Sequence, residues 1–162
     1  NNGHPMQAWY DILPTNGPRR EDEASLREAH AQVMWLIERE IARGVPSERI
    51  VLMGFSQGCA MTLMTGLRCP HKLAGLVAMS GYLPLADTTS VERKPINQDT
   101  PIFMAHGSED DVVSITRGAA ARDALVGLGY DVSWHSYPMA HSLCMAEIDD
   151  IHAWVADRLR LA

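Results

Sequence analysis

The chain has 162 residues, of which 46% are hydrophobic and 21% charged, a composition typical of a globular protein that buries its own core. The formal net charge of −6 argues against nucleic acid or an anionic membrane as the main partner, because both reward clustered Lys and Arg. The longest apolar run is too short to span a bilayer, and the first residues carry no apolar signal-peptide stretch. We therefore expect one domain over residues 1–162, without stable membrane insertion.

The sulfur-containing residues indicate neither a disulfide framework nor a metal site. Cys59, Cys69 and Cys144 are odd in number and form no C-x-x-C pair, which favours a reducing compartment and a cytoplasmic location. No His-x-x-x-His spacing occurs, so we expect no metal and no other cofactor. Four methionines in apolar segments are interpreted as core residues: Met53, Met61, Met64 and Met79.

The first predicted elements are an irregular segment and a long helix. Prolines and glycines punctuate residues 1–20, which we expect to be irregular. Apolar residues then recur at steps of three and four from Leu26 to Ile41, which predicts an amphipathic helix. Gly44 stands where a residue that ends such a helix belongs.

The rest of the chain alternates between short apolar runs and helical patterns. The predicted strands are residues 50–55, 76–79, 102–105 and 132–137, and the predicted helices are residues 57–67, 115–128 and 145–159. Residues 82–100 are expected to form a long loop. The alternation predicts an α/β fold, a mostly parallel sheet of about four strands with helices on both faces. Functional groups of such sheets gather at the carboxyl ends of the strands.

A G-x-S-x-G pattern, residues 54–58, ends the first of these strands and opens the following helix. A turn of this kind holds Ser56 in a strained backbone conformation, and Gly54 and Gly58 are expected to let strand and helix approach closely. The Ser56 hydroxyl would then stand at the helix N-terminus, where the Gln57 amide can donate to an oxyanion. A chance match is the alternative for the bare pattern, but the strand–turn–helix context favours a nucleophile.

A nucleophilic serine needs a histidine base. His141 lies in a loop after the last predicted strand, from which it can reach back over the carboxyl edge of the sheet. His30 and His152 fall in helical stretches and His135 falls within a strand. His106 ends a strand, but together with the glycine that follows it is interpreted as shaping a turn.

The third expected group is a carboxylate on the loop after the strand that precedes His141. Glu109, Asp110 and Asp111 all lie there, and composition does not separate them from one another or from a solvated acidic turn. The chain order serine, acid, histidine is that of the α/β-hydrolases.

These motifs resemble the phospholipase/carboxylesterase family, which includes acyl-protein thioesterases and small bacterial carboxylesterases. The matching segments are A-W-Y-D-I at residues 8–12, G-F-S-Q-G at 54–58, the strand and loop at 73–84, H-G-S-E-D-D-V-V at 106–113 and M-A-H at 139–141. The family pattern H-G-x-x-D-P-V-V selects Asp110 as the acid, and M-G-H supports His141 as the base. The resemblance implies an α/β-hydrolase-type fold.

The chain departs from the family pattern in several places. Asp111 replaces the usual proline, Cys59 replaces a second glycine of the elbow, and Ala140 replaces the glycine before the histidine. No H-G-x-G loop of the kind that completes the family's oxyanion hole precedes Trp9, so we expect an N-terminally truncated hydrolase in which only the Gln57 amide is assigned. The missing strands would expose one edge of the strand at residues 50–55, and we expect self-association there.

The implied activity is a serine carboxylesterase that hydrolyses short- to medium-chain carboxylic esters or thioesters through an acyl-enzyme. Ser56 would attack, His141 would carry the proton and Asp110 would orient the histidine, with a small-molecule ester as the partner. The candidate residues of an acyl pocket are Trp9, Tyr10, Leu83 and Leu85. Acyl transfer to an acceptor other than water is one alternative. Another is a catalytically weak or inactive fragment that acts as an interaction module, because the oxyanion loop is absent.

Overall fold

The computed structural model describes residues 7–13 and 20–160 of the chain. At its centre lies a parallel sheet of four strands. In spatial order these are β3 (Val51–Phe55), β4 (Gly75–Met79), β5 (Ile102–Gly107) and β6 (Val132–Tyr137). Phe55 pairs with Met79, which pairs with Ala105, so the strands end side by side and present their following loops at one edge.

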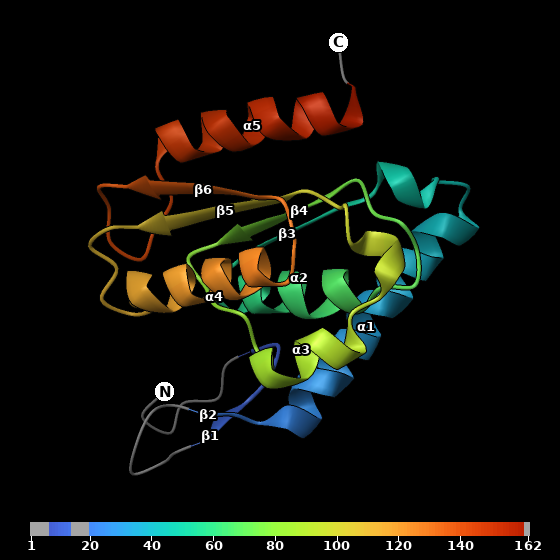
Figure 1. The fold of residues 1–162 in the computed structure, drawn as a ribbon, viewed down its shortest axis with the longest axis horizontal. Coiled ribbons are helices and arrows are strands. Elements are labelled where there is room, and N and C mark those ends of the chain that lie inside the picture. The colour runs from blue at the N-terminus through green and yellow to red at the C-terminus, as the bar shows by residue number, and fades with distance from the viewer. Residues whose placement is uncertain (1–6, 14–19, 161–162) are drawn as a thin grey trace.

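Helices cover both faces of this sheet, as the sequence predicts (Figure 1). α5 (Met145–Leu159) lies alone over one face. On the other face α2 (Gln57–Arg68) packs against β3 and β4, and α4 (Ile115–Gly127) packs against β5 and β6. α1 (Glu23–Ala42) packs on the outside of α2, and Gly44 follows it with a φ of +95°, as expected for a residue that ends a helix.

The segment expected to be a long loop contains a further helix, α3 (Ala86–Glu92), and a 3₁₀ turn at Pro95–Asn97. A second 3₁₀ turn, Ser47–Arg49, precedes β3. α3 has only seven residues and little intrinsic helix preference. The buried Arg68 of α2 holds it in place, with bonds of 2.6 Å to Glu92 and 3.0 Å to Thr88. Such support comes from tertiary contacts and leaves no periodic pattern in the sequence.

The N-terminal segment is more regular than predicted. β1 (Ile12–Leu13) and β2 (Arg20–Glu21) pair in antiparallel fashion, with Ile12 opposite Glu21. The rest of the segment expected to be irregular lies outside the described residues, apart from residues 7–11. Two-residue strands are below the length at which alternation can be recognised, which is why the pattern did not reveal them.

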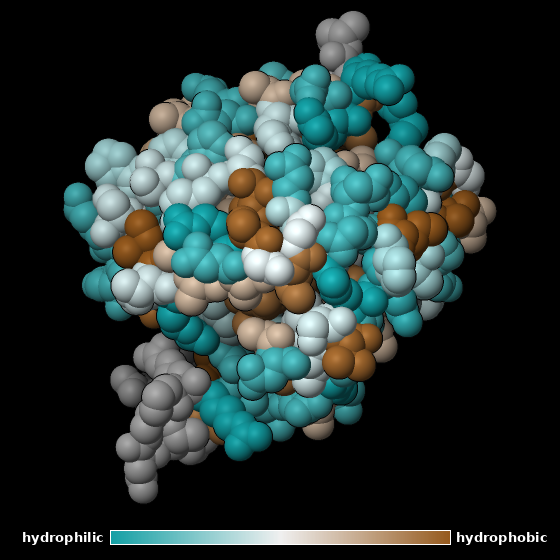
Figure 2. Space-filling model, in the orientation of Figure 1, coloured by the Kyte–Doolittle hydropathy of each residue, from teal (hydrophilic) through white to brown (hydrophobic). Residues whose placement is uncertain are grey.

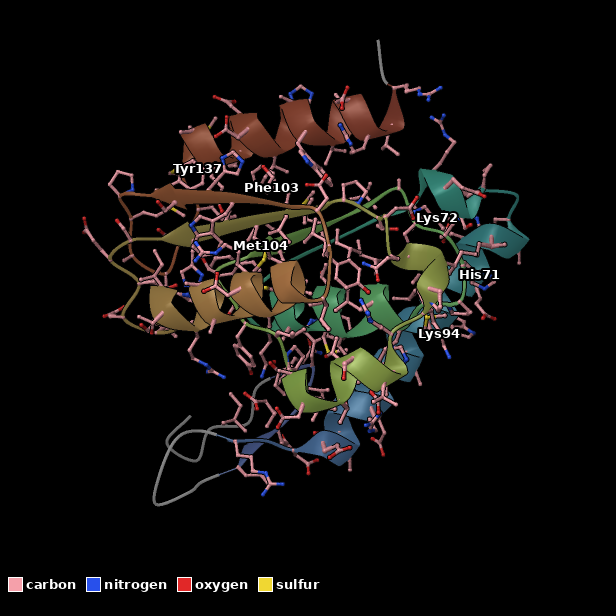
Figure 3. All side chains as sticks on the ribbon, viewed as in Figure 1. His71, Lys72, Lys94, Phe103, Met104 and Tyr137 are labelled. Atoms are coloured by element: carbon pink, nitrogen blue, oxygen red, sulfur yellow. The ribbon has the colours of Figure 1, made fainter. Side chains whose placement is uncertain are left out.

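The sheet separates two apolar layers. On β5, Phe103 joins the cluster under α5, whereas its neighbour Met104 joins the cluster under α2 and α4 (Figure 3). Alternate side chains of a strand point to opposite faces, and here both faces are buried. Burial of β5 is complete from Ile102 to Gly107.

β3 forms an edge of the sheet, and this corrects one prediction about the core. Met61, Met64 and Met79 are buried as expected, but the side chain of Met53 is 51% exposed. On the face of the molecule shown in Figure 2, exposed apolar residues are scattered among polar ones. Among the described residues, no helix combines the length and the hydrophobicity needed to cross a membrane.

Candidate active site

Ser56 occupies the turn between β3 and α2 in an unusual backbone conformation, with φ of 57° and ψ of −117°. Non-glycine residues rarely adopt a positive φ, and such strain is typical of a nucleophile elbow. Gly54 is required because a Cβ there would lie 2.1 Å from the carbonyl oxygen of Gly58. A Cβ on Gly58 would meet open space, so the expectation that both glycines serve the close approach is right only for Gly54.

Three of the predicted site residues are joined by hydrogen bonds. Nε2 of His141 lies 2.9 Å from the Ser56 hydroxyl, and Nδ1 of His141 lies 2.7 Å from Oδ2 of Asp110. An ionised carboxylate can only accept, so Nδ1 carries the proton and Nε2 is left to accept from the serine. The ring of Phe55 packs 4.7 Å from the imidazole of His141 and limits its movement.

Asp110, and not its neighbour Asp111, faces the histidine. The Asp110 side chain is fully buried, and its Oδ1 accepts from the amides of Val112 (2.9 Å) and Val113 (2.8 Å). Burial by itself raises the pKa of the Asp110 carboxyl, but the hydrogen bonds from His141 and the two amides outweigh it and hold that pKa below its usual value. Asp110 is therefore ionised at neutral pH, whereas Asp111 is exposed to solvent.

The loops that carry the acid and the histidine are fastened to each other by their backbones. The Ser108 amide donates to the Tyr137 carbonyl at 2.8 Å, and the Glu109 amide donates to the Met139 carbonyl at 3.1 Å. Gly107 lies where the loops cross, because a Cβ on it would stand 2.3 Å from the Met139 oxygen. Asp110 and His141 are thus brought together by main-chain contacts at the ends of β5 and β6.

The backbone amide of Gln57 opens α2, where the first amides of a helix have no intrahelical acceptor. Such amides, together with the helix dipole, favour negative charge beside Ser56. The Gln57 side chain binds the N-terminal segment instead, since its Oε1 accepts from the Trp9 amide and its Nε2 donates to the Tyr10 carbonyl, both at 3.0 Å. The Trp9 amide is therefore already engaged and is not free to be a second oxyanion donor.

The residues predicted to line an acyl pocket lie in different places. Trp9 is 43% exposed beside the elbow, whereas Tyr10 is buried, with its hydroxyl 2.6 Å from that of Tyr82. Leu85 is half-buried in a left-handed conformation, with φ of 45°. Leu83 alone of the four borders a cavity of about 190 Å³, whose lining is Tyr82, Leu83, Ala86, Arg117, Ala120, Ala121 and Ala124. This cavity contains no member of the Ser56–His141–Asp110 chain.

Two further reactive side chains, Cys59 and His30, are buried or hydrogen-bonded. The Cys59 thiol is completely buried, and burial raises its pKa to about 12, so it does not compete as a nucleophile. His30 bonds to Thr65 at 3.1 Å from within α1. Within residues 7–13 and 20–160, no three His, Cys, Asp or Glu side chains come together as a metal site would require.

Nearly the whole length of the chain matches a known protein family. The family model for phospholipases and carboxylesterases matches residues 1–158. The chain belongs to the phospholipase/carboxylesterase family. Its fold and the serine, histidine and aspartate at its strand ends follow the pattern that the sequence motifs indicate, and membership in this family supports a hydrolase of the esterase type.

Relatives from the phospholipase/carboxylesterase family align with nearly the whole chain. An acyl-protein thioesterase 1 of Neurospora crassa is 44% identical over 165 residues, which cover 97% of this chain and 67% of the relative. An acyl-protein thioesterase 1 of Gibberella zeae is 41% identical and covers 98% of this chain and 71% of its own length. Both relatives are fungal, and this argues against the expectation that the chain is a small bacterial carboxylesterase.

A solved member shows the same architecture. The crystal structure of Arabidopsis thaliana SOBER1 superimposes with a TM-score of 0.89 at 32% sequence identity, over 98% of this chain and 77% of that one. The four-stranded parallel sheet and its helices therefore form part of an established α/β-hydrolase fold.

Sequence reasoning missed two groups that this site uses. The Gln57 side chain received no role, although it fastens the N-terminal segment to the elbow. The sequence predicts only a turn-shaping role for His106, whereas in the structure its Nε2 is buried 3.5 Å from Oδ2 of Asp110. The one available signal was the placement of His106 at the end of a predicted strand, beside the acidic loop.

Proposed function

We propose that this chain is a serine hydrolase of carboxylic esters or thioesters that works through an acyl-enzyme. The observation that carries the proposal is the hydrogen-bonded chain from the Ser56 hydroxyl through His141 to Asp110, at 2.9 and 2.7 Å, on a strained elbow. The similarity to fungal acyl-protein thioesterases supports thioesters among the substrates.

In this mechanism His141 accepts the proton of Ser56 as the serine oxygen attacks the acyl carbonyl. The Gln57 amide stabilises the oxyanion of the tetrahedral intermediate. His141 then returns the proton to the leaving group, and the same cycle with water as nucleophile releases the acid. The ionised Asp110 stabilises the imidazolium that forms at each step. Acetyl and butyryl esters, whose acyl groups are short and apolar, are suitable first substrates.

The test is hydrolysis of p-nitrophenyl acetate and butyrate and of the matching thioesters by the intact chain, beside a Ser56→Ala variant. Turnover that disappears with the serine is the expected result. A folded chain with no turnover on any of these substrates would contradict the proposal. Transfer of the acyl group to an added alcohol or amine, measured in the same assay, separates hydrolysis from acyl transfer.

A second candidate function, an interaction module with weak or no catalysis, is favoured by one observation. Among residues 7–13 and 20–160, we assign only the Gln57 amide to the oxyanion, and the Trp9 amide that lies nearby is already bonded to the Gln57 side chain. Loss of one oxyanion donor costs about 100- to 1,000-fold in kcat. A turnover rate that low, with full labelling of Ser56 by a fluorophosphonate, is the outcome that this candidate predicts.

We further propose that the chain acts as one catalytic domain and associates with itself along β3. The strand is an edge of the sheet and exposes Met53, and unpaired edges are templates for pairing with a second strand. Light scattering at micromolar concentration is expected to show a dimer or larger species. Met53→Lys should shift the distribution toward the monomer, and a wild-type monomer would contradict the proposal. We also propose a cytoplasmic location, because three free cysteines are typical of a reducing compartment.

A further inference from the structure

His106 is a buried histidine that the proposed mechanism does not use. It lies near the end of β5, is 1% exposed, and places Nε2 2.8 Å from the carbonyl oxygen of Val113. A carbonyl oxygen only accepts, so Nε2 of His106 carries a proton and donates it to this bond. The tautomer is thereby fixed by the backbone of the acid loop.

Val113 connects this histidine to the acid. Its carbonyl accepts from His106, and its own amide donates to Oδ1 of Asp110 at 2.8 Å. The same Nε2 of His106 lies 3.5 Å from Oδ2 of Asp110, the oxygen that accepts from His141. One N–H group therefore holds the loop on which Asp110 depends, and its nitrogen also lies near the Asp110 oxygen that accepts from His141.

The His106 ring has no room to turn away. A Cβ on Gly118 of α4 would stand 2.4 Å from Nδ1, so the helix backbone closes directly over this edge of the ring. The ring of Trp134 on β6 stacks beside the imidazole, with 6.2 Å between the ring centroids and 28° between the ring planes. The charged groups that border this cluster are Asp110 and Arg122, whose guanidinium lies 5.0 Å from the Trp134 ring.

We propose that His106 is a positioning residue for the hydrolysis proposed above: its Nε2–H fixes the acid loop so that Oδ2 of Asp110 stays aligned with Nδ1 of His141. This inference rests on the proposed function. It assigns His106 no contact with substrate, so its removal should change the rate of the chemical step and leave substrate binding largely intact. Misplacement of a catalytic group by about 1 Å can lower a rate about 100-fold.

The experiment compares His106→Phe, which keeps an aromatic ring but removes the donor, with His106→Gln, whose side-chain amide can donate from nearly the place of Nε2. With p-nitrophenyl butyrate, His106→Phe is expected to lower kcat about 10- to 100-fold with KM changed by no more than about twofold. His106→Gln is expected to recover most of that loss. The low-field proton resonance of the His141–Asp110 hydrogen bond should persist in wild type and His106→Gln and be lost or shifted in His106→Phe.

The matched control is His135→Phe. His135 is a half-buried histidine on the neighbouring strand that stacks on Phe103 at 4.5 Å and bonds to Ser133 at 2.9 Å, and its replacement should leave kcat unchanged. Circular dichroism establishes that each variant is folded. If His106→Phe does not fold, His106→Met provides a smaller and more flexible side chain without a donor for the same comparison.

Two outcomes would overturn this inference alone: a His106→Phe or His106→Met variant with wild-type kcat, or equal losses in the donor-free and His106→Gln variants. In both cases turnover that depends on Ser56 would still stand. Absence of turnover that depends on Ser56 in the wild-type chain would instead overturn the proposed function, and the positioning role with it.

Discussion

Two regions meet at the turn that carries Ser56 and are held by different kinds of contact. The loops that carry Asp110 and His141 are joined mainly by backbone bonds, such as that from the Ser108 amide to the Tyr137 carbonyl at 2.8 Å, and the Ser56 amide is bonded to the Met79 carbonyl of the neighbouring strand at 2.9 Å. Apart from the backbone bonds between β1 and β2 and from the Asp22 amide to the Asp11 carbonyl, the N-terminal arm, residues 7–13, is held largely by side chains. Gln57 binds it at two atoms, and further bonds come from Tyr82 and Ser25.

The difference has a physical basis. Backbone bonds between strand ends are set by the fold and survive most side-chain changes, so a catalytic geometry built on them is rigid. An arm held by a few side chains can be displaced by one substitution, and its local stability is correspondingly low. We therefore expect the loops that carry the proposed chemistry and the N-terminal arm to respond separately to mutation.

The largest expected effect is on the acid. In Asp110→Asn an NH2 group takes the place of Oδ2 and donates to Nδ1 of His141, which favours the wrong tautomer and should lower kcat by about 10,000-fold. Asp111→Asn is the matched control, because its side chain is exposed and should affect kcat by no more than about twofold. Steady-state kinetics of the two variants show which carboxylate the reaction requires. Equal losses would mean that the two carboxylates share the role.

The crossing of the two catalytic loops gives the next effect. In Gly107→Ala the new methyl group meets the carbonyl oxygens of Met139 and Ala140 at 2.3 and 2.5 Å, so both loops must shift. Overpacking of this kind destabilises by about 1–3 kcal/mol, and kcat should fall with it. Gly127→Ala, where a Cβ would meet open space at the end of α4, should change stability by less than about 1 kcal/mol. Urea unfolding compares the two, and similar losses would contradict the steric account.

The arm should respond to Gln57→Met, which keeps the length of the side chain and removes both hydrogen bonds. Each bond contributes about 0.5–1.5 kcal/mol, so the arm should open more often while the sheet stays intact. Hydrogen exchange is expected to show a faster Trp9 amide and unchanged amides in β5. Tyr82→Phe, which loses the bond to Tyr10 but keeps both bonds of Gln57 to the arm, should leave the Trp9 amide protected. Uniformly faster exchange across the sheet would mean that the arm and core open together.

The smallest effect is a dependence on pH at Glu147. This side chain is buried in the first turn of α5, and neither of its carboxylate oxygens has a hydrogen-bond partner within the described part of the chain. Burial raises the pKa of the Glu147 carboxyl, and the nearby backbone of Cys144, which forms no hydrogen bond with it by distance and angle, only partly offsets this rise. The folded state therefore holds this proton more tightly than the unfolded state.

The sign of the dependence follows from that difference. Stability linked to Glu147 is fully present below the ordinary carboxyl pKa and is lost as pH rises through the raised one. Glu147→Gln removes the ionisation, so the variant should have a higher Tm than wild type at pH 8 and a smaller difference at pH 4. Thermal unfolding of both proteins from pH 4 to pH 8 measures this difference in Tm. A wild type that gains stability from pH 4 to 8 relative to the variant would reverse the assignment.

Much of the architecture could be read from local sequence patterns. Steps of three and four predict α1, and apolar runs predict β3 to β6, because each pattern reflects the repeat of one element. Patterns of this kind do not reveal α3, which Arg68 holds from another helix, or the ribbon of β1 and β2. They also place Met53 in the core, because a strand at the edge of a sheet looks like one at its centre.

The chain by itself determined which side chains could carry the chemistry. Ser56 follows from the strand–turn–helix context, His141 from its loop, and the order of serine, acid and histidine from their succession along the chain, and their catalytic role stays a prediction. The family resemblance already favours Asp110, and the tertiary structure shows that Asp110 and not Asp111 reaches the histidine. The tertiary structure alone decided that Gln57 holds the arm and that the imidazole of His106 bonds to the acid loop. These outcomes depend on contacts between residues up to 48 positions apart, which only the packing of the sheet brings together.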